Sequence, residues 1–247
     1  FPLNNALIYF HGIKRATQMQ VKQIIFKTGE QLFPEAARQR VASALDQIQP
    51  GLVALLMNYE PGSEKTKSEF PAVQFGRAKG GFALLGFGQM GATLVDDAAP
   101  FIVRGLSKEV SGIINVHHRE VELSIERRPY QFQYRVGSMV VQKRREHRAY
   151  MADQVKGKAH LEALFLRSLQ RQADAVGMSL PEELEIEFLG AERVTTAKGK
   201  GYDPMALKGA VFGVNARLGG IWSVGYMLSK GYGQFDATYQ LGLGVTQ

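Results

Sequence analysis

Short strands and helices alternate in a similar way at the two ends of the chain. The N-terminal unit is predicted from residues 20–27 (strand), 34–49 (helix opened by Pro34), 52–57 and 72–103 (strands). The C-terminal unit is predicted from residues 209–218 (strand), 221–229 (short helix) and 234–245 (strand). Units of this kind favour two α+β domains over a single parallel α/β sheet. We place the first domain at residues 1–108 and the second at 109–247.

The middle of the chain adds a hairpin and a helical insertion to the second domain. Residues 121–136 alternate as two strands, and Arg127-Arg128-Pro129 is expected to form the turn between them. Residues 143–176 are predicted to be helical. One side of this insertion is mostly apolar and carries Leu161, Phe165, Leu169, Gln172 and Val176, and the opposite side is basic and carries Lys156, His160, Arg167 and Arg171. Such a helix packs against the protein and presents cations outward.

The excess positive charge is concentrated in the middle of the chain. The sequence holds 30 Lys and Arg against 23 Asp and Glu, and residues 104–171 contain 14 of the basic and only 7 of the acidic side chains. A surplus that served solubility would be spread out, whereas a concentrated one is typical of a surface that binds a polyanion. The densest run is Lys143-Arg144-Arg145-Glu146-His147-Arg148. We therefore expect nucleic acid as a ligand.

Several classes of protein and site are excluded by what the sequence lacks. The chain contains no cysteine, which excludes a disulfide framework, an iron–sulfur cluster and a thiolate zinc site. No run approaches the ~18 apolar residues of a membrane helix, and the first residues do not resemble a signal peptide. We therefore expect a cytoplasmic protein with no membrane partner. His117 and His118 would point to opposite faces of a strand, so no metal or other cofactor is expected.

A glycine-rich pattern in the last 40 residues is the most specific signal. Lys208–Val214 is a strand pattern, Lys230-Gly231-Tyr232-Gly233 follows a short helix, and Gly242 and Gly244 lie in the final strand. Glycines let backbone N–H groups approach a phosphodiester, Lys230 adds charge, and Tyr232 can stack on a base. Gly231 after Lys230 is also the ordinary C-cap of a helix. The loop alone leaves both interpretations open.

As a whole, this C-terminal segment resembles the C-terminal domain of the CRISPR repeat-processing endoribonucleases, which belong to the repeat-associated RNA-binding superfamily. The Arg-rich insertion at 143–176 looks most like the processing enzyme of type IV CRISPR systems. The resemblance implies an α+β fold of two tandem ferredoxin-like (RRM-like) domains. It also implies two kinds of partner, the repeat hairpin of CRISPR RNA (crRNA) and the other subunits of a CRISPR effector complex.

The resemblance further implies metal-independent cleavage of the precursor RNA beside its stem-loop. The 2′-hydroxyl before the scissile bond attacks the adjacent phosphate, which leaves a cyclic phosphate and a 5′-hydroxyl, and the enzyme stays on the 3′ hairpin. Such chemistry needs a base, an acid and a cation near the phosphate. Many relatives place a histidine in or near the first helix, and residues 28–49 of this chain contain none.

Two arginines and one histidine are the candidates for chemistry near the first helix. Arg38 and Arg40 stay protonated, so they would stabilise charge rather than accept a proton. His11 is the nearest histidine and belongs to a residue type suited to proton transfer. We predict Arg38 and His11 as catalytic residues. The predicted RNA contacts are Lys14, Arg15, Arg40, Lys143, Arg144, Arg145, Arg148, Arg167, Arg171, Lys230, Gly231, Tyr232 and Gly233.

The missing histidine leaves a second function open. A non-catalytic RNA-binding subunit of the same ribonucleoprotein complex would need the basic surface and the glycine-rich loop but no proton-transfer group. Cleavage of the bound RNA distinguishes the two functions.

Overall fold

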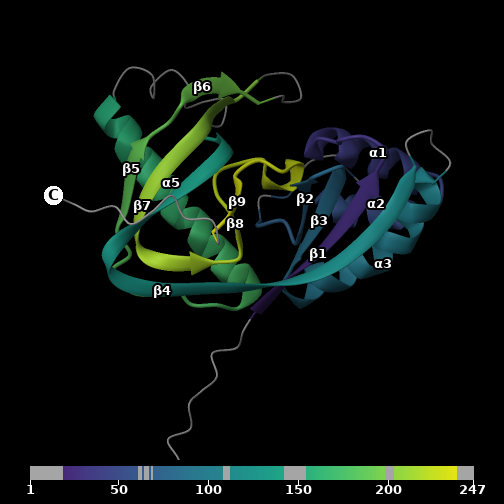
Figure 1. Ribbon diagram of the computed structural model, residues 1–247, viewed down its shortest axis with the longest axis horizontal. Helices are drawn as coiled ribbons and strands as arrows, with labels where there is room; N and C mark the ends of the chain where they lie inside the picture. Colours follow the sequence, from purple (N-terminus) through teal and green to yellow (C-terminus); the bar gives the residue numbers. More distant parts are fainter. Residues whose placement is uncertain are drawn as a thin grey trace, which may run out of the picture.

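One antiparallel sheet runs through both halves of the molecule (Figure 1). A computed structural model describes residues 19–60, 63, 67, 69–107, 112–141, 154–197 and 203–237. Within them, the strand order of the sheet is β2-β3-β1-β4-β7-β5, β6 pairs with β7, and β8 and β9 form a second, small sheet. The long strand β4 (Ile113–Val140) pairs with β1 through its first part and with β7 through its second. This strand therefore joins the two halves.

Helices cover one face of the sheet in the N-terminal half. Its elements are β1 (Met19–Thr28), α1 (Pro34–Asp46), α2 (Pro50–Leu56), β2 (Val73–Ala78), β3 (Gly81–Phe87), α3 (Gly88–Leu106) and the first part of β4. Ile24 and Phe26 of β1 lie in one buried cluster with Val41 of α1 and Ile102 of α3. The other face contacts β8 and β9, because Leu85 belongs to the same cluster as Phe235.

The C-terminal half packs one long helix against its strands. Its elements are α5 (Gln154–Val176), β5 (Ile186–Gly190), β6 (Arg193–Thr196), β7 (Met205–Gly219), β8 (Ile221–Ser223), the 3-10 helix η1 (Leu228–Lys230) and β9 (Gln234–Asp236). The apolar side predicted for this helix is confirmed, since Leu161, Phe165, Leu169, Gln172 and Val176 are all buried. Phe165 of α5 packs on Phe212 of β7, with the ring centroids 4.4 Å apart.

A buried tyrosine fixes β4 to the end of β7. The hydroxyl of Tyr134 donates a hydrogen bond to the carbonyl of Ala216 at 3.0 Å and accepts one from the amide of Leu218 at 2.7 Å. Burial raises the pKa of the Tyr134 phenol above its ordinary value of 10.0. The group therefore keeps its proton and both hydrogen bonds through neutral pH.

The hairpin predicted over 121–136 is wrong, because this segment is part of one continuous strand. The pairing of β4 with β7 shifts between Arg127 and Phe132, so the irregularity at Pro129 is a bulge and not a turn. A proline has no N–H for the ladder and is tolerated at such a bulge. The chain therefore runs on through Pro129 instead of reversing.

Three other segments differ from the sequence-based expectation. Residues 50–56 form the helix α2 and not a strand, and the glycine-rich stretch predicted as strands over 72–103 continues as helix α3 from Gly88. The short helix expected over 221–229 is the strand β8 followed by the turn η1. The strand expected over 234–245 is present as β9 up to Asp236, and residues 238–245 lie outside the described part. The proposed domain boundary at residue 108 also lies outside it.

Candidate nucleic-acid interface

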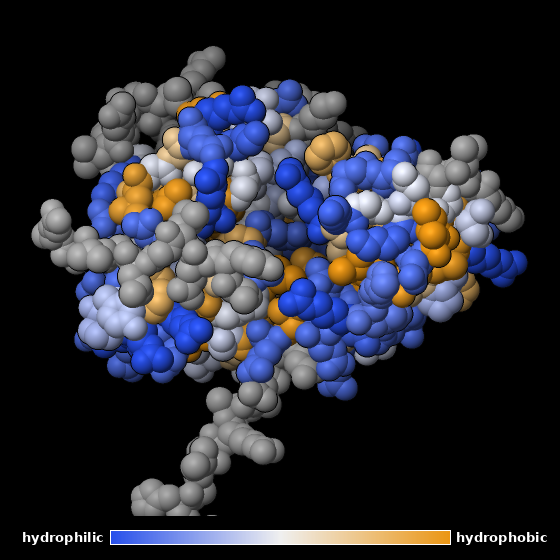
Figure 2. Space-filling model, in the orientation of Figure 1, coloured by the Kyte–Doolittle hydropathy of each residue, from blue (hydrophilic) through white to orange (hydrophobic). Residues whose placement is uncertain are grey.

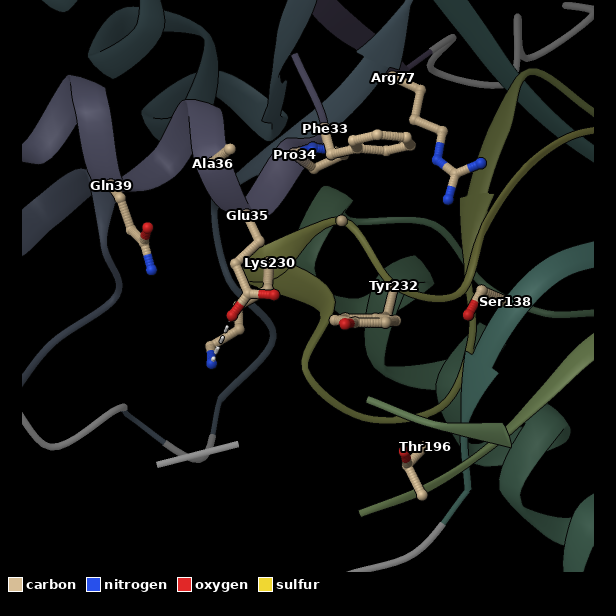
Figure 3. Close-up of a pocket in the computed structure, with 11 residues that line it drawn as sticks. Phe33, Pro34, Glu35, Ala36, Gln39, Arg77, Ser138, Thr196, Lys230 and Tyr232 are labelled. Carbon is tan, nitrogen blue, oxygen red and sulfur yellow. Dashed lines mark ion pairs between the residues drawn. The ribbon is translucent and has the colours of Figure 1, made fainter. Parts of the chain in front are cut away.

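A cavity of about 410 Å³ opens between the two halves of the molecule, where helix α1 begins (Figure 3). The start of α1, strands β2, β4 and β6, and the turn after η1 all contribute to it. Its wall is formed by Phe33, Pro34, Glu35, Ala36, Gln39, Arg77, Ser138, Thr196, Lys230, Gly231 and Tyr232. Segments that are far apart in the sequence therefore meet at this one site.

The N-terminus of α1 gives the cavity a positive electrostatic end. Pro34 occupies the first helical turn, and the N-cap residue Phe33 makes no side-chain cap. The first-turn amides of a helix have no intrahelical partner, and the helix dipole favours an anion there. The carboxylate of Glu35 lies 3.6 Å from the Nζ of Lys230, so an ion pair links α1 to η1.

An exposed aromatic ring and an arginine lie together on one wall. The side chain of Phe33 is 62% exposed, and the guanidinium of Arg77 lies 5.6 Å from its ring centroid. Tyr232 lies across the opening from Phe33 in Figure 3. An exposed ring beside a cation suits single-stranded nucleic acid, because bases stack on rings and phosphates pair with cations. The ring of Tyr232 is half-buried.

The glycines of the predicted RNA-binding loop serve the packing of the protein. Gly231 has φ +82° and caps η1, and its amide donates to the carbonyl of Leu228 at 2.9 Å. The amide of Gly233 donates to the carbonyl of Ser138 at 2.6 Å. An RNA contact through these two amides would therefore compete with hydrogen bonds inside the protein. Lys230 and Tyr232 remain the loop side chains that reach the cavity.

Comparison with known protein families shows to which family this chain belongs. The family model of the type IV CRISPR-associated endonuclease Csf5 matches residues 19–238. The chain belongs to the Csf5 family. The resemblance to type IV processing enzymes that the sequence indicated is thereby confirmed. A search among curated proteins found no match.

Solved structures show the same fold as this Csf5-family chain at low sequence identity. A structure titled "Csf5, CRISPR-Cas type IV Cas6 crRNA endonuclease" is 18% identical, with a TM-score of 0.63 over 88% of this chain and 98% of that one. A crystal structure of Cas6b is 13% identical, with a TM-score of 0.67 over 89% of this chain and 99% of that one. The α+β architecture is therefore a Cas6-like fold.

Arg38, one of the two predicted catalytic residues, is buried in this Csf5-family protein. Its side chain is 9% exposed, and Nη2 donates a hydrogen bond to the carbonyl of Met57 at 3.0 Å. The guanidinium also lies 5.2 Å from the ring centroid of Tyr59. These contacts hold α1 against the end of α2, and Arg38 does not contribute to the wall of the cavity. The catalytic role of Arg38 stays a prediction, and its packing favours a structural one.

We expect the substitution Arg38→Met to lower the free energy of unfolding and to leave the cleavage rate of the folded protein unchanged. Losing a charged hydrogen bond to a buried carbonyl costs about 1.5–3 kcal/mol, and chemical denaturation measures it. Arg40→Met is the matched control on the same helix. Arg40 pairs with Glu30 at 2.5 Å on the surface, where such a pair contributes about 0–1 kcal/mol. A slower reaction with unchanged stability in Arg38→Met would support catalysis instead.

The other predicted residues divide into two groups. His11, Lys14, Arg15, Lys143, Arg144, Arg145 and Arg148 lie outside the described residues, and their roles stay predictions. Arg167 and Arg171 are exposed on α5, away from the cavity wall. Within the described ranges, no group of three or more metal-ligating side chains could hold a metal ion. No helix in that same part of the Csf5-family chain is long and apolar enough to cross a membrane.

The sequence did not indicate six polar or aromatic residues of the cavity: Phe33, Glu35, Gln39, Arg77, Ser138 and Thr196. They come from four separate segments, so no local motif marks them. Phe33 carries the one usable signal, because a large aromatic residue directly before Pro34 lies outside the apolar stripe of the helix.

Hydrophilic residues cover much of the face drawn in Figure 2, with small apolar groups between them.

Proposed function

We propose that the protein binds the repeat of precursor crRNA and cuts it as an endoribonuclease. Membership of the Csf5 family supports the reaction class. The main support for the proposal is that Arg77, from the N-terminal half of the molecule, and Lys230, from the C-terminal half, line the same cavity at the start of α1. Two cations beside a helix N-terminus attract the negative charge of a phosphodiester.

The proposed reaction is an attack by the 2′-oxygen on the neighbouring phosphorus. The bond between phosphorus and the 5′-oxygen breaks, and the departing 5′-oxygen takes a proton from solvent. The products are a 2′,3′-cyclic phosphate and a 5′-hydroxyl. Arg77 and Lys230 would stabilise the negative charge that grows on the non-bridging oxygens. Glu35 supplies a carboxylate on the same wall that can accept the 2′ proton. His11 remains the alternative proton-transfer group.

The same surface would hold the RNA around the cut. Phe33 and Tyr232 offer rings on which unpaired bases stack. Arg167 and Arg171, together with the basic run 143–148, would contact the hairpin backbone. We further propose that the protein stays on the 3′ hairpin among other effector subunits after cleavage.

The proposed architecture is two ferredoxin-like domains fused through β4. The order β-α-β-β-α-β of the N-terminal half, with α2 added after α1, supports this assignment for the first domain. In the second half, α5 follows β4 and the short turn η1 lies between β8 and β9. Residues 1–108 and 109–247 remain the proposed domains.

Cleavage of repeat RNA from a CRISPR array of the same genome tests the function. We expect a product with a cyclic phosphate, equal rates with and without EDTA, and no product from RNA with a 2′-deoxynucleotide before the scissile phosphate. Dependence on a divalent ion, or cleavage of the deoxy substrate, would point to attack by water instead. Binding without any cleavage would favour the non-catalytic RNA-binding subunit.

A further inference from the structure

A second cavity continues from the first between the N-terminal sheet and the segment of β8 and β9. It has a volume of about 230 Å³ and shares Arg77, Ser138 and Gly231 with the cavity at the start of α1. Its other lining residues are Gln23, Gly76, Leu85, Gly137, Ile221, Gln234, Phe235 and Asp236. An RNA strand that places a phosphate at Arg77 therefore has room for a neighbouring nucleotide here.

One side chain of this second cavity has an unmet hydrogen bond. Gln23 is only 8% exposed, and its Oε1 accepts no hydrogen bond within the described part of the chain. Gln23 is paired in register with Leu85, so both side chains lie on the face of the sheet that meets β8 and β9. Leaving a buried acceptor unpaired costs about 1–3 kcal/mol. A ligand with an N–H group at this position would remove that cost.

The neighbouring Gln234, in contrast, uses its side-chain amide in hydrogen bonds that hold parts of the protein together. The Nε2 of Gln234 donates to the Oε1 of Gln74 at 3.1 Å and to the carbonyl of Phe75 at 2.9 Å. The hydroxyl of Ser223 donates to the same Oε1 at 2.8 Å. These bonds fix β9 against β2. Gln23 Oε1 takes no part in this network, and Gln23 is one of the residues that line the second cavity.

The remaining wall suits a flat base. Leu85, Ile221 and Phe235 give apolar and aromatic surface. Proteins read RNA sequence mostly from unstacked single bases held between such groups. Acceptors select bases that carry an exocyclic amino group, which cytosine has and uracil lacks.

We propose that this second cavity binds one unpaired nucleotide beside the cleavage site and that Gln23 selects a base with an exocyclic amino group. The proposal rests on the proposed function, since it needs RNA in the first cavity. Gln23 is a specificity-determining residue in this scheme, and it takes no part in bond breaking.

Fluorescence anisotropy with labelled r(C)10 and r(U)10 tests the selection, because cytosine and uracil differ in the group that Gln23 would contact. We expect the full chain to bind r(C)10 about threefold to tenfold more tightly than r(U)10, as one hydrogen bond allows. The variant Gln23→Met should bind both probes alike. Gln47→Met, at the exposed C-cap of α1, is the matched control and should keep the preference.

A second variant keeps the test decisive if Gln23→Met fails to fold. A Cβ at Gly137 would meet nothing within 4 Å, so Gly137→Val extends into the open space that this residue lines. We expect it to fold and to lower the affinity for r(C)10 to that for r(U)10. Equal binding of both probes by the unmodified chain, or an unchanged preference in a folded variant, would overturn the selection alone. No binding of either probe by a chain that still binds repeat RNA would overturn the nucleotide site, and no binding of repeat RNA would overturn the proposed function itself.

Discussion

Replacing Arg77 by alanine is expected to slow single-turnover cleavage of repeat RNA about 10²- to 10³-fold, as the loss of one electrostatic stabiliser does in other enzymes. Arg77 lines both cavities and lies against the exposed ring of Phe33. Its charge would act on the phosphorane, so the rate should fall more than the affinity. Rapid-quench measurements with the enzyme in excess, beside binding titrations, separate the two constants.

Two further variants sharpen this prediction. Arg77→Lys keeps the charge but loses the planar group that lies over Phe33, so it should recover only part of the rate. Arg104→Ala removes an exposed arginine in the last turn of α3, outside both cavities, and should cleave like the unmodified protein. If Arg77→Ala and Arg104→Ala behave alike, Arg77 is not part of the reaction.

The sequence predicted those elements whose pattern is set by burial on one side. Pro34 opens α1 as expected. Of the apolar residues whose helical spacing predicted a buried stripe, Ala37, Val41 and Leu45 are fully buried, whereas Ala44 and Ile48 are half-buried. The same reasoning gave the apolar side of α5. Residues 50–56 were missed because a short apolar run fits a buried strand as well as a helix. Here the run forms the separate helix α2, which follows α1 and packs against the N-terminal core.

Glycines that allow close packing were interpreted as strand residues in the sequence, although some of them lie in a helix. The predicted strands over 72–103 include α3, and Gly91 lies in its first turn. A Cβ at Gly91 would lie 2.3 Å from the carbonyl oxygen of Ala72, and one at Gly86 would lie 2.3 Å from the carbonyl oxygen of Gly91. These glycines let the helix approach the strands. Composition alone cannot distinguish this use from a glycine-rich strand.

The candidate site was predictable only where one segment supplies several of its residues. Lys230 and Tyr232 are neighbours in a glycine-rich loop, and both line the cavity. Arg77 and Phe33 come from segments more than 40 residues apart. They meet because the fold places strand β2 next to the start of α1. Arg38 was singled out by its place in the first helix, but helical periodicity turns it toward Met57 and Tyr59.

Gly233→Ala is expected to destabilise the fold by roughly 3–5 kcal/mol, because a positive φ and a steric clash add together. Gly233 has φ +73°, and an added Cβ would lie 1.8 Å from the carbonyl oxygen of Val224. The amide of Val224 also donates to the carbonyl of Gly233 at 3.0 Å, so the two backbone segments cannot move apart without losing this hydrogen bond. Urea denaturation of the full chain measures the loss.

Gly29→Ala is the matched control, since a Cβ there would meet nothing within 4 Å. It should change the free energy of unfolding by less than about 1 kcal/mol. The comparison also separates the two roles that the glycine-rich loop can have. If Gly233→Ala folds as stably as Gly29→Ala and loses only RNA affinity, the loop acts through its backbone on the ligand. Loss of the folded state instead means that Gly233 positions Tyr232 and Lys230 by holding η1 and β9 against β4, where its amide bonds to Ser138.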